Sequence, residues 1–183
     1  MRKPLIAGNW KLNGNLVDNQ ALVASILSGL AEVNADLLLC PSTVYLQQVI
    51  KLAGEGVLVG AQDAAEQSSG AFTGETSAQM LADIGVNYVL LGHSERRSLF
   101  ADSDTRVANK FAQVIQAGLT PVLCLGESLA EREAGQTELV VARQLNAVIE
   151  SNPDVDWGDV VLCLLYTSPS PRDQRGSRMP SSA

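Results

Sequence analysis

The chain has 183 residues, of which 46% are hydrophobic and 18% are charged, and its formal net charge is −7. This length and composition indicate one soluble, globular domain with a sizeable core and exclude a disordered polypeptide. The acidic balance argues against nucleic acid as a partner, and no run of 18 apolar residues is present that could cross a membrane.

Short apolar runs alternate along the chain with amphipathic segments. The runs predict strands at residues 5–10, 36–40, 57–61, 88–91, 119–125 and 159–165. The periodic segments predict a helix after residues 13–15, with Val23, Ile26, Leu27 and Leu30 on one face, and helices at 43–52, 77–84 and 104–117. A capping box at 128–131 opens a last helical region, whose apolar stripe covers 141–149, and a Gly- and Ser-rich loop occupies 62–76.

Six continuously apolar strands that alternate with helices indicate right-handed βαβ units and a parallel sheet. The sheet could be doubly wound and open, or closed as a barrel. No GxGxxG motif follows the first strand, as a dinucleotide-binding fold would require. Polar residues gather after the strands, among them Asn9, Lys11, Gln62, His93 and Glu127. Both architectures place an active site there, and we favour the barrel.

The three cysteines and the start of the chain bear on the cellular compartment. Cys40, Cys124 and Cys163 lie in apolar runs, with no CxxC pair and no histidine at ligand spacing. The first apolar run stops at Asn9, so it does not form a signal peptide. We therefore expect reduced thiols, no metal site and a cytoplasmic protein.

The only histidine lies in the segment Tyr88-Val-Leu-Leu-Gly-His-Ser-Glu-Arg-Arg97. After the predicted strand, Ser94 is a good N-cap and Glu95 a favourable charge in the first turn of a helix. His93 would then lie beside the positive end of that helix, which opposes protonation and leaves a neutral ring able to donate a hydrogen bond. From these residues alone, a core histidine at a strand end is the commoner alternative.

Five motifs occur in order on the predicted strands and loops: Ala7-Gly-Asn-Trp-Lys-Leu-Asn13, Gly60-Ala-Gln62, Gly70-Ala-Phe-Thr-Gly-Glu75, Leu91-Gly-His-Ser-Glu-Arg-Arg97 and Pro121-Val-Leu-Cys-Leu-Gly-Glu127. Together, over about residues 1–162, they resemble the bacterial triosephosphate isomerase family. The resemblance implies a (β/α)8 barrel, with about six βα units present as an incomplete barrel over residues 1–165. It also implies cofactor-free interconversion of dihydroxyacetone phosphate and D-glyceraldehyde 3-phosphate, in glycolysis and gluconeogenesis, by a homodimer. No nucleic acid and no membrane would be partners.

The resemblance also assigns roles to individual residues. Asn9 and Lys11 would contact the substrate, with Lys11 stabilising its negative charge. His93 would be the electrophile, and a neutral histidine in this role is well established for this family. Glu95 would hold Lys11 in place, and Ser94 and Glu127 would contact the substrate-binding residues without touching the substrate.

A loop following the third strand resembles the segment that inserts into a partner subunit. Its residues are Gln62, Phe72, Thr73, Gly74 and Glu75, with Thr73 near the tip. A connection of about 15 residues in so compact a fold is more often functional than idle.

The sixth strand departs from the family. Family members continue with Ala-Tyr-Glu-Pro-Val-Trp, in which Glu is the catalytic base, whereas this chain reads Cys163-Leu-Leu165-Tyr-Thr-Ser. Leu165 stands at the position of the base and cannot accept a proton. The seventh and eighth strands and the phosphate-binding loops are also missing from the sequence. We therefore expect a member of this family that has lost its isomerase activity. An alternative is that the chain is a catalytically dead fragment whose role, if any, is to bind another protein through the loop Gly70–Glu75.

Residues 166–183 differ from the rest in composition. They hold three of the seven prolines, five serines and three arginines, without apolar periodicity. This composition predicts a disordered tail. The abrupt change within a strand is typical of a frameshift, a chimeric join or translated non-native sequence, and three arginines are weak support for a nucleic-acid arm or a phosphorylation target.

Overall fold

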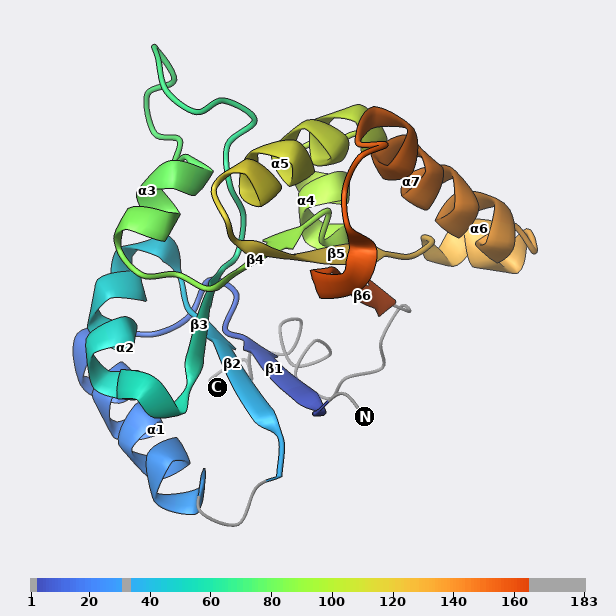
Figure 1. The fold of residues 1–183 in the computed structure, drawn as a ribbon. Coiled ribbons are helices and arrows are strands. Elements are labelled where there is room, and N and C mark those ends of the chain that lie inside the picture. Colours follow the sequence, from blue (N-terminus) through green and yellow to red (C-terminus); the bar gives the residue numbers. More distant parts are fainter. Residues whose placement is uncertain (1–2, 31–33, 165–183) are drawn as a thin grey trace, which may run out of the picture.

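A computed structural model describes residues 3–30 and 34–164 (Figure 1). It contains a six-stranded parallel sheet in the order β1-β2-β3-β4-β5-β6, so every strand pairs with its neighbours in the sequence. The strands are β1 (Leu5–Asn9), β2 (Asp36–Cys40), β3 (Leu58–Ala61), β4 (Tyr88–Leu91), β5 (Thr120–Leu125) and β6 (Val161–Leu164). A doubly wound sheet reverses its strand order at a switch point, and this sheet does not. The predicted incomplete barrel is therefore confirmed.

Seven α-helices occur among the described residues: α1 (Leu16–Gly29), α2 (Leu46–Ala53), α3 (Ala78–Asp83), α4 (Ser94–Leu99), α5 (Asp104–Gln116), α6 (Leu129–Glu133) and α7 (Thr137–Ser151). The 3-10 turns are Thr43–Tyr45, Gly54–Gly56 and Trp157–Asp159. None of these helices is long and apolar enough to cross a membrane. Leu165 and the predicted tail at 166–183 lie outside the described residues.

Local sequence signals explain where several helices begin and end. Asn15 accepts hydrogen bonds from the N–H groups of Val17 and Asp18 at the start of α1. The predicted capping box of Ser128 and Glu131 is present, and the hydrogen bonds from Ser128 lower the pKa of Glu131. Gly118, at a φ of +72°, follows α5 as the stop that the sequence predicts.

The predicted start of the sixth strand is wrong by two residues. Asp159 belongs to a 3-10 turn, and β6 begins at Val161. The side chain of Asp156 accepts a hydrogen bond from the N–H of Gly158, which stabilises this turn in place of extended backbone.

The core has two layers, one on each side of the sheet. The larger layer lies between the sheet and the helices and includes Leu39, Leu46, Val49, Val89, Leu91, Val107, Phe111, Val114, Leu123 and Val148. A smaller cluster of Leu38, Cys40, Leu90 and Val122 fills the other face of the sheet. The two outer strands are less well covered: Ile6 of β1 is 54% exposed, and Leu162 and Leu164 of β6 are 49% and 51% exposed. Within the described residues, each of these strands pairs on one side only.

Candidate active site

Lys11 follows β1 and has a left-handed backbone conformation, with a φ of 54°. This conformation costs a residue with a side chain about 1–2 kcal/mol, so neighbouring groups must maintain it. Three hydrogen bonds do so. The N–H of Lys11 donates to Asn9 Oδ1 at 2.9 Å, and Ser42 Oγ and Gln62 Nε2 both donate to the carbonyl oxygen of Lys11 at 2.9 Å. Side chains after three adjacent strands therefore fix the position of one lysine.

The ammonium group of Lys11 is held by Glu95. Lys11 Nζ lies 2.9 Å from Glu95 Oε1, and the two side chains are 32% and 47% exposed. Glu95 belongs to α4, which follows β4, so this ion pair joins the end of β1 to the end of β4. Because both side chains are partly exposed, this ion pair contributes little to stability, but it fixes the direction of the ammonium group.

His93 is the N-cap of α4, whereas the sequence predicted Ser94 in this place. His93 Nδ1 accepts a hydrogen bond from the N–H of Glu95 at 3.2 Å, which is the bond that a capping serine would accept. Ser94 becomes the first residue of the helix instead. Because Nδ1 acts as an acceptor, the neutral ring carries its proton on Nε2. The side chain is 13% exposed, so this donor lies in a partly dry environment.

Glu95 brings Lys11 and His93 together. Its carboxylate pairs with Lys11 at 2.9 Å, and its backbone N–H donates to His93 Nδ1 at 3.2 Å. An ammonium group and an imidazole ring therefore meet at the carboxyl edge of the sheet. This arrangement can stabilise negative charge that develops on a substrate oxygen.

Glu127 follows β5 and is buried, with a side chain that is 2% exposed. Its Oε1 accepts no hydrogen bond within the described residues, and Arg132 Nε lies 3.9 Å away. Glu127 lines a polar cavity of about 630 Å³ together with Ser94 and Glu95. The structure thus brings these three predicted residues to one cavity, whereas Asn9 and Lys11 line another, of about 920 Å³, beside β1.

A family model described as "Triosephosphate isomerase" matches residues 4–164. The chain belongs to the triosephosphate isomerase family. It is 53% identical over 150 residues to the triosephosphate isomerase of Dechloromonas aromatica and 55% identical over 150 residues to that of Thiobacillus denitrificans. Each comparison covers 81% of this chain and 60% of the relative. The enzyme of Cupriavidus taiwanensis is 47% identical over 163 residues, which are 88% of this chain and 66% of the relative. The chain therefore spans about 60% of the length of the first two relatives.

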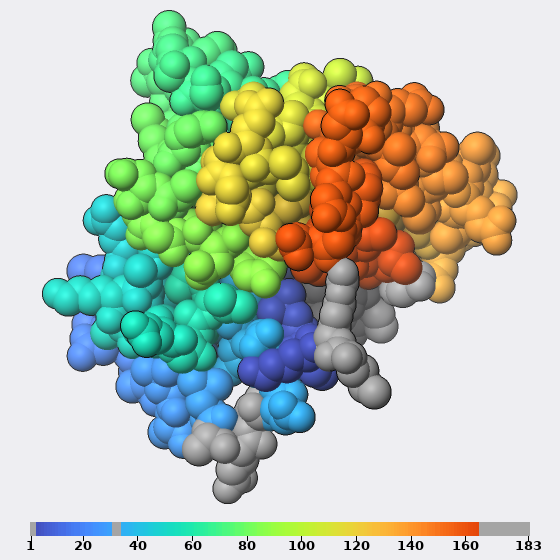
Figure 2. Space-filling view, viewed as in Figure 1, coloured from blue at the N-terminus to red at the C-terminus, as the bar shows by residue number. Residues whose placement is uncertain are grey.

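The long connection between β3 and α3, residues 62–77, projects from the body of the molecule (Figure 2). Gln62 lies at its base and points inward, since Nε2 donates to the carbonyl oxygens of Lys11 and Cys40 at 2.9 Å. Phe72 lies near the tip and is 45% exposed. The base of this connection is therefore fixed to the body of the molecule, whereas its tip is exposed to solvent.

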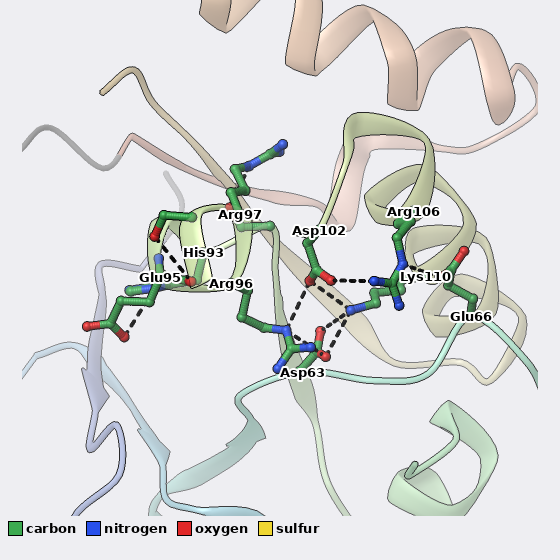
Figure 3. A network of polar contacts seen from close by, with 11 residues as sticks. Asp63, Glu66, His93, Glu95, Arg96, Arg97, Asp102, Arg106 and Lys110 are labelled. Carbon is green, nitrogen blue, oxygen red and sulfur yellow. Dashed lines mark hydrogen bonds and ion pairs between the residues drawn. The ribbon is translucent and has the colours of Figure 1, made fainter. Parts of the chain in front are cut away.

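A buried network of charges anchors this loop (Figure 3). Lys110 of α5 is 1% exposed and donates to Asp63 at 2.9 and 3.0 Å and to Asp102 at 2.8 Å. Arg96 of α4 pairs with the same two carboxylates at 2.8 and 2.9 Å. A further pair, Arg106–Glu66 at 2.6 Å, ties the loop to α5. The network therefore connects the loop base to the helix that carries Glu95.

The two carboxylates of the network respond differently to burial. Burial raises the pKa of Asp63 above its usual range, although Lys110 and Arg96 oppose the shift. Burial also acts on Asp102, but hydrogen bonds from Lys110 and Arg96 outweigh it and lower the pKa of Asp102. Asp102 is therefore the carboxylate that the network holds ionised most firmly.

Sequence reasoning missed Ser42 and Lys110, and it did not foresee the contact of Gln62 with Lys11. One signal was present for Lys110: position 110 falls on the apolar stripe of Val107, Phe111 and Val114, and a charge on a buried stripe needs a partner. No sequence signal distinguished Ser42. Among the described residues, no group of three His, Cys, Asp or Glu side chains could hold a metal ion.

Proposed function

We propose that the complete protein interconverts dihydroxyacetone phosphate and D-glyceraldehyde 3-phosphate, and that this chain carries the electrophilic part of its active site. The observation that supports this proposal is the double contact of Glu95, whose carboxylate pairs with Lys11 and whose backbone N–H donates to His93 Nδ1. It places a positive charge and a neutral hydrogen-bond donor at one edge of the sheet, where barrels of this type bind their substrates.

Each residue has a distinct part in this proposal. His93 Nε2–H donates to the substrate oxygen on which negative charge develops as a proton leaves the adjacent carbon. Lys11 stabilises that charge and the phosphate group, and its ion pair with Glu95 keeps the ammonium group in position. Asn9, which accepts from the N–H of Lys11, holds this turn and contacts the substrate.

Leu165, by its register in the sequence, leaves the chain without a catalytic base. We propose that isomerase turnover by this chain lies at or near background, because loss of a general base alone lowers a rate by about 10²–10⁴, or roughly 3–5 kcal/mol. A coupled assay of the purified chain, with an intact family enzyme as the positive control, tests this. Turnover within about tenfold of the intact enzyme would contradict it.

Substrate binding can be tested apart from turnover. The chain has a single histidine, so ¹⁵N labelling of histidine reports on His93 alone. We expect dihydroxyacetone phosphate to shift the His93 resonances, and Lys11→Met to weaken that response by about tenfold or more. Lys51→Met, at an exposed lysine of α2, is the matched control and should leave the response unchanged. An equal response in the Lys11 and Lys51 variants would contradict the role of Lys11.

We also propose that the loop Gly70–Glu75 docks on a second family subunit, as a homodimer or as an inactive chain bound to an intact one. Its support is an exposed tip on a firm base: Ala65 N–H donates to Thr76 O at 2.9 Å, and Glu75 N–H donates to Phe72 O at 3.0 Å. Sedimentation of a mixture with an intact family enzyme should show a complex. Thr73→Arg should abolish that complex, whereas Leu139→Arg, at an exposed site on α7, should not. We also propose, from its membership of this family, that the protein is cytoplasmic.

A further inference from the structure

Cys124 and Cys163 are register partners on β5 and β6. Side chains at paired positions of neighbouring parallel strands lie on the same face of the sheet. Neighbouring strands are about 4.8 Å apart, which falls within the Cα separation of about 4.4–6.8 Å that a disulfide requires. The register therefore places the two thiols next to each other. In this structure both are free.

The surroundings of the two thiols differ. Cys124 is 2% exposed, whereas Cys163 is half-buried and so within reach of small solutes. The S–H of Cys124 donates to the carbonyl oxygen of Val122 at 3.8 Å. The neighbouring Cys124 thiol lowers the pKa of Cys163 to about 7, although burial opposes this, and the interaction with Cys163 together with burial raises the pKa of Cys124.

The third cysteine provides a contrast within the same chain. Cys40 of β2 is fully buried, and burial raises the pKa of its thiol to about 12. This thiol is hidden from solutes, and its register partner on β1 is Asn9 rather than a second cysteine, so it has neither an oxidant nor a thiol within reach. The lowered pKa of Cys163 makes this thiol ionise more readily than an ordinary cysteine. Cys163 is therefore the reactive thiol, and Cys124 is the hidden neighbour.

We propose that Cys163 and Cys124 form a peroxide-oxidisable dithiol in which Cys163 is attacked and Cys124 resolves the product. The Cys163 thiolate attacks one oxygen of hydrogen peroxide, breaks the O–O bond and forms a sulfenic acid, with hydroxide as the leaving group. The sulfur of Cys124 then displaces the sulfenic oxygen, which leaves as water with the Cys124 proton, and the S–S bond forms. The two sulfurs are oxidised by two electrons in total, and the peroxide is reduced to water.

This site does not depend on the proposed isomerase function. Relative to the family pattern, Cys163 occupies the alanine position of Ala-Tyr-Glu, so the dithiol belongs to the part of the strand where this chain departs from the family. The S–S bond would join the outer strand β6 covalently to β5.

The test uses the whole chain, fully reduced and then freed of reductant, with hydrogen peroxide at pH 7. Trypsin cuts at Arg132 and Arg143 and so separates the peptides of Cys124 and Cys163. We expect intact mass to show the loss of two hydrogen atoms, and non-reducing peptide mapping to show a Cys124–Cys163 cross-link within one chain. Cys163→Ser should slow thiol oxidation by about tenfold or more, and Cys40→Ser should leave it unchanged.

Cys124→Ser separates the roles of the two thiols. Without its partner, Cys163 should accumulate as sulfenic and then sulfinic acid, detected by a sulfenate-selective probe and by mass. Sulfinic acid at Cys163 of the unmodified chain, a cross-link only between chains, or a cross-link that includes Cys40 would each overturn the proposal. If Cys124→Ser does not fold, as judged by circular dichroism, the peptide map of the unmodified chain decides alone.

Discussion

Replacing Lys110 by methionine removes the centre of the buried charge network and keeps most of the side-chain volume. In the native chain, the ammonium group makes three hydrogen bonds of 2.8–3.0 Å to Asp63 and Asp102. The Lys110 side chain is 2% exposed and that of Asp102 is not exposed at all. The variant therefore leaves two neighbouring carboxylates in a poorly hydrated place, with Arg96 as their main remaining partner.

The expected loss in the free energy of unfolding is about 3–5 kcal/mol, the usual cost of removing one partner from a buried ion pair. The loss should be smaller in acid, because protonated carboxyl groups no longer repel each other. Adding Asp63→Asn should recover part of the loss, since it removes the carboxylate whose pKa burial already raises. The two changes should be non-additive by about 1 kcal/mol or more.

Urea unfolding followed by circular dichroism measures these values, with Lys51→Met as the control for loss of an exposed lysine, expected to change stability by less than about 0.5 kcal/mol. A Lys110→Met variant within about 1 kcal/mol of the unmodified chain would refute the reasoning. It would mean that the cost of burying three charges already cancels their attraction.

Three further predictions concern other parts of the molecule. Lysine at Leu162 and Leu164 should raise solubility and reduce light scattering, because charge on an outer strand opposes strand addition; light scattering that is unchanged by the two substitutions would contradict this. In ¹⁵N NMR at neutral pH, His93 should carry its proton on Nε2, and a proton on Nδ1 would show that the helix cap is not formed. The free energy of unfolding should decrease as the pH is lowered below about 4, because the lowered pKa of Asp102 makes the unfolded state bind more protons than the folded state there. A plot of the free energy of unfolding against pH in this range should have a smaller slope for Asp102→Asn.

The order of elements could be predicted from sequence because each rests on a local signal. Continuous apolar runs gave all six strands, and the stripe of Val107, Phe111 and Val114 gave α5, whose inner face packs on the sheet. The closed or open form of the sheet had no local signal. It depends on strand order, which only pairing between distant segments reveals.

The site was predictable by residue type but not by geometry. Lys11 and His93 could be named from motifs, yet the strained backbone of Lys11 and its bond from Ser42, 31 positions away, have no local signature. The cap at His93 was missed for a physical reason: serine is the better general cap, but the helix begins at Ser94, so the capping position falls on His93, whose imidazole nitrogen accepts from the N–H of Glu95.

The strand order has a consequence for how the chain assembles. Because β1 to β6 pair in the order of synthesis, each strand emerges from the ribosome when its neighbour is already in place. Contacts between strands are therefore as local as a parallel sheet allows, which lowers the contact order and favours fast, stepwise growth from the N-terminus. At every step the newest strand is also the outermost one. The strand order that allows stepwise folding therefore also exposes an unpaired backbone edge to other nascent chains, until the next strand pairs with it.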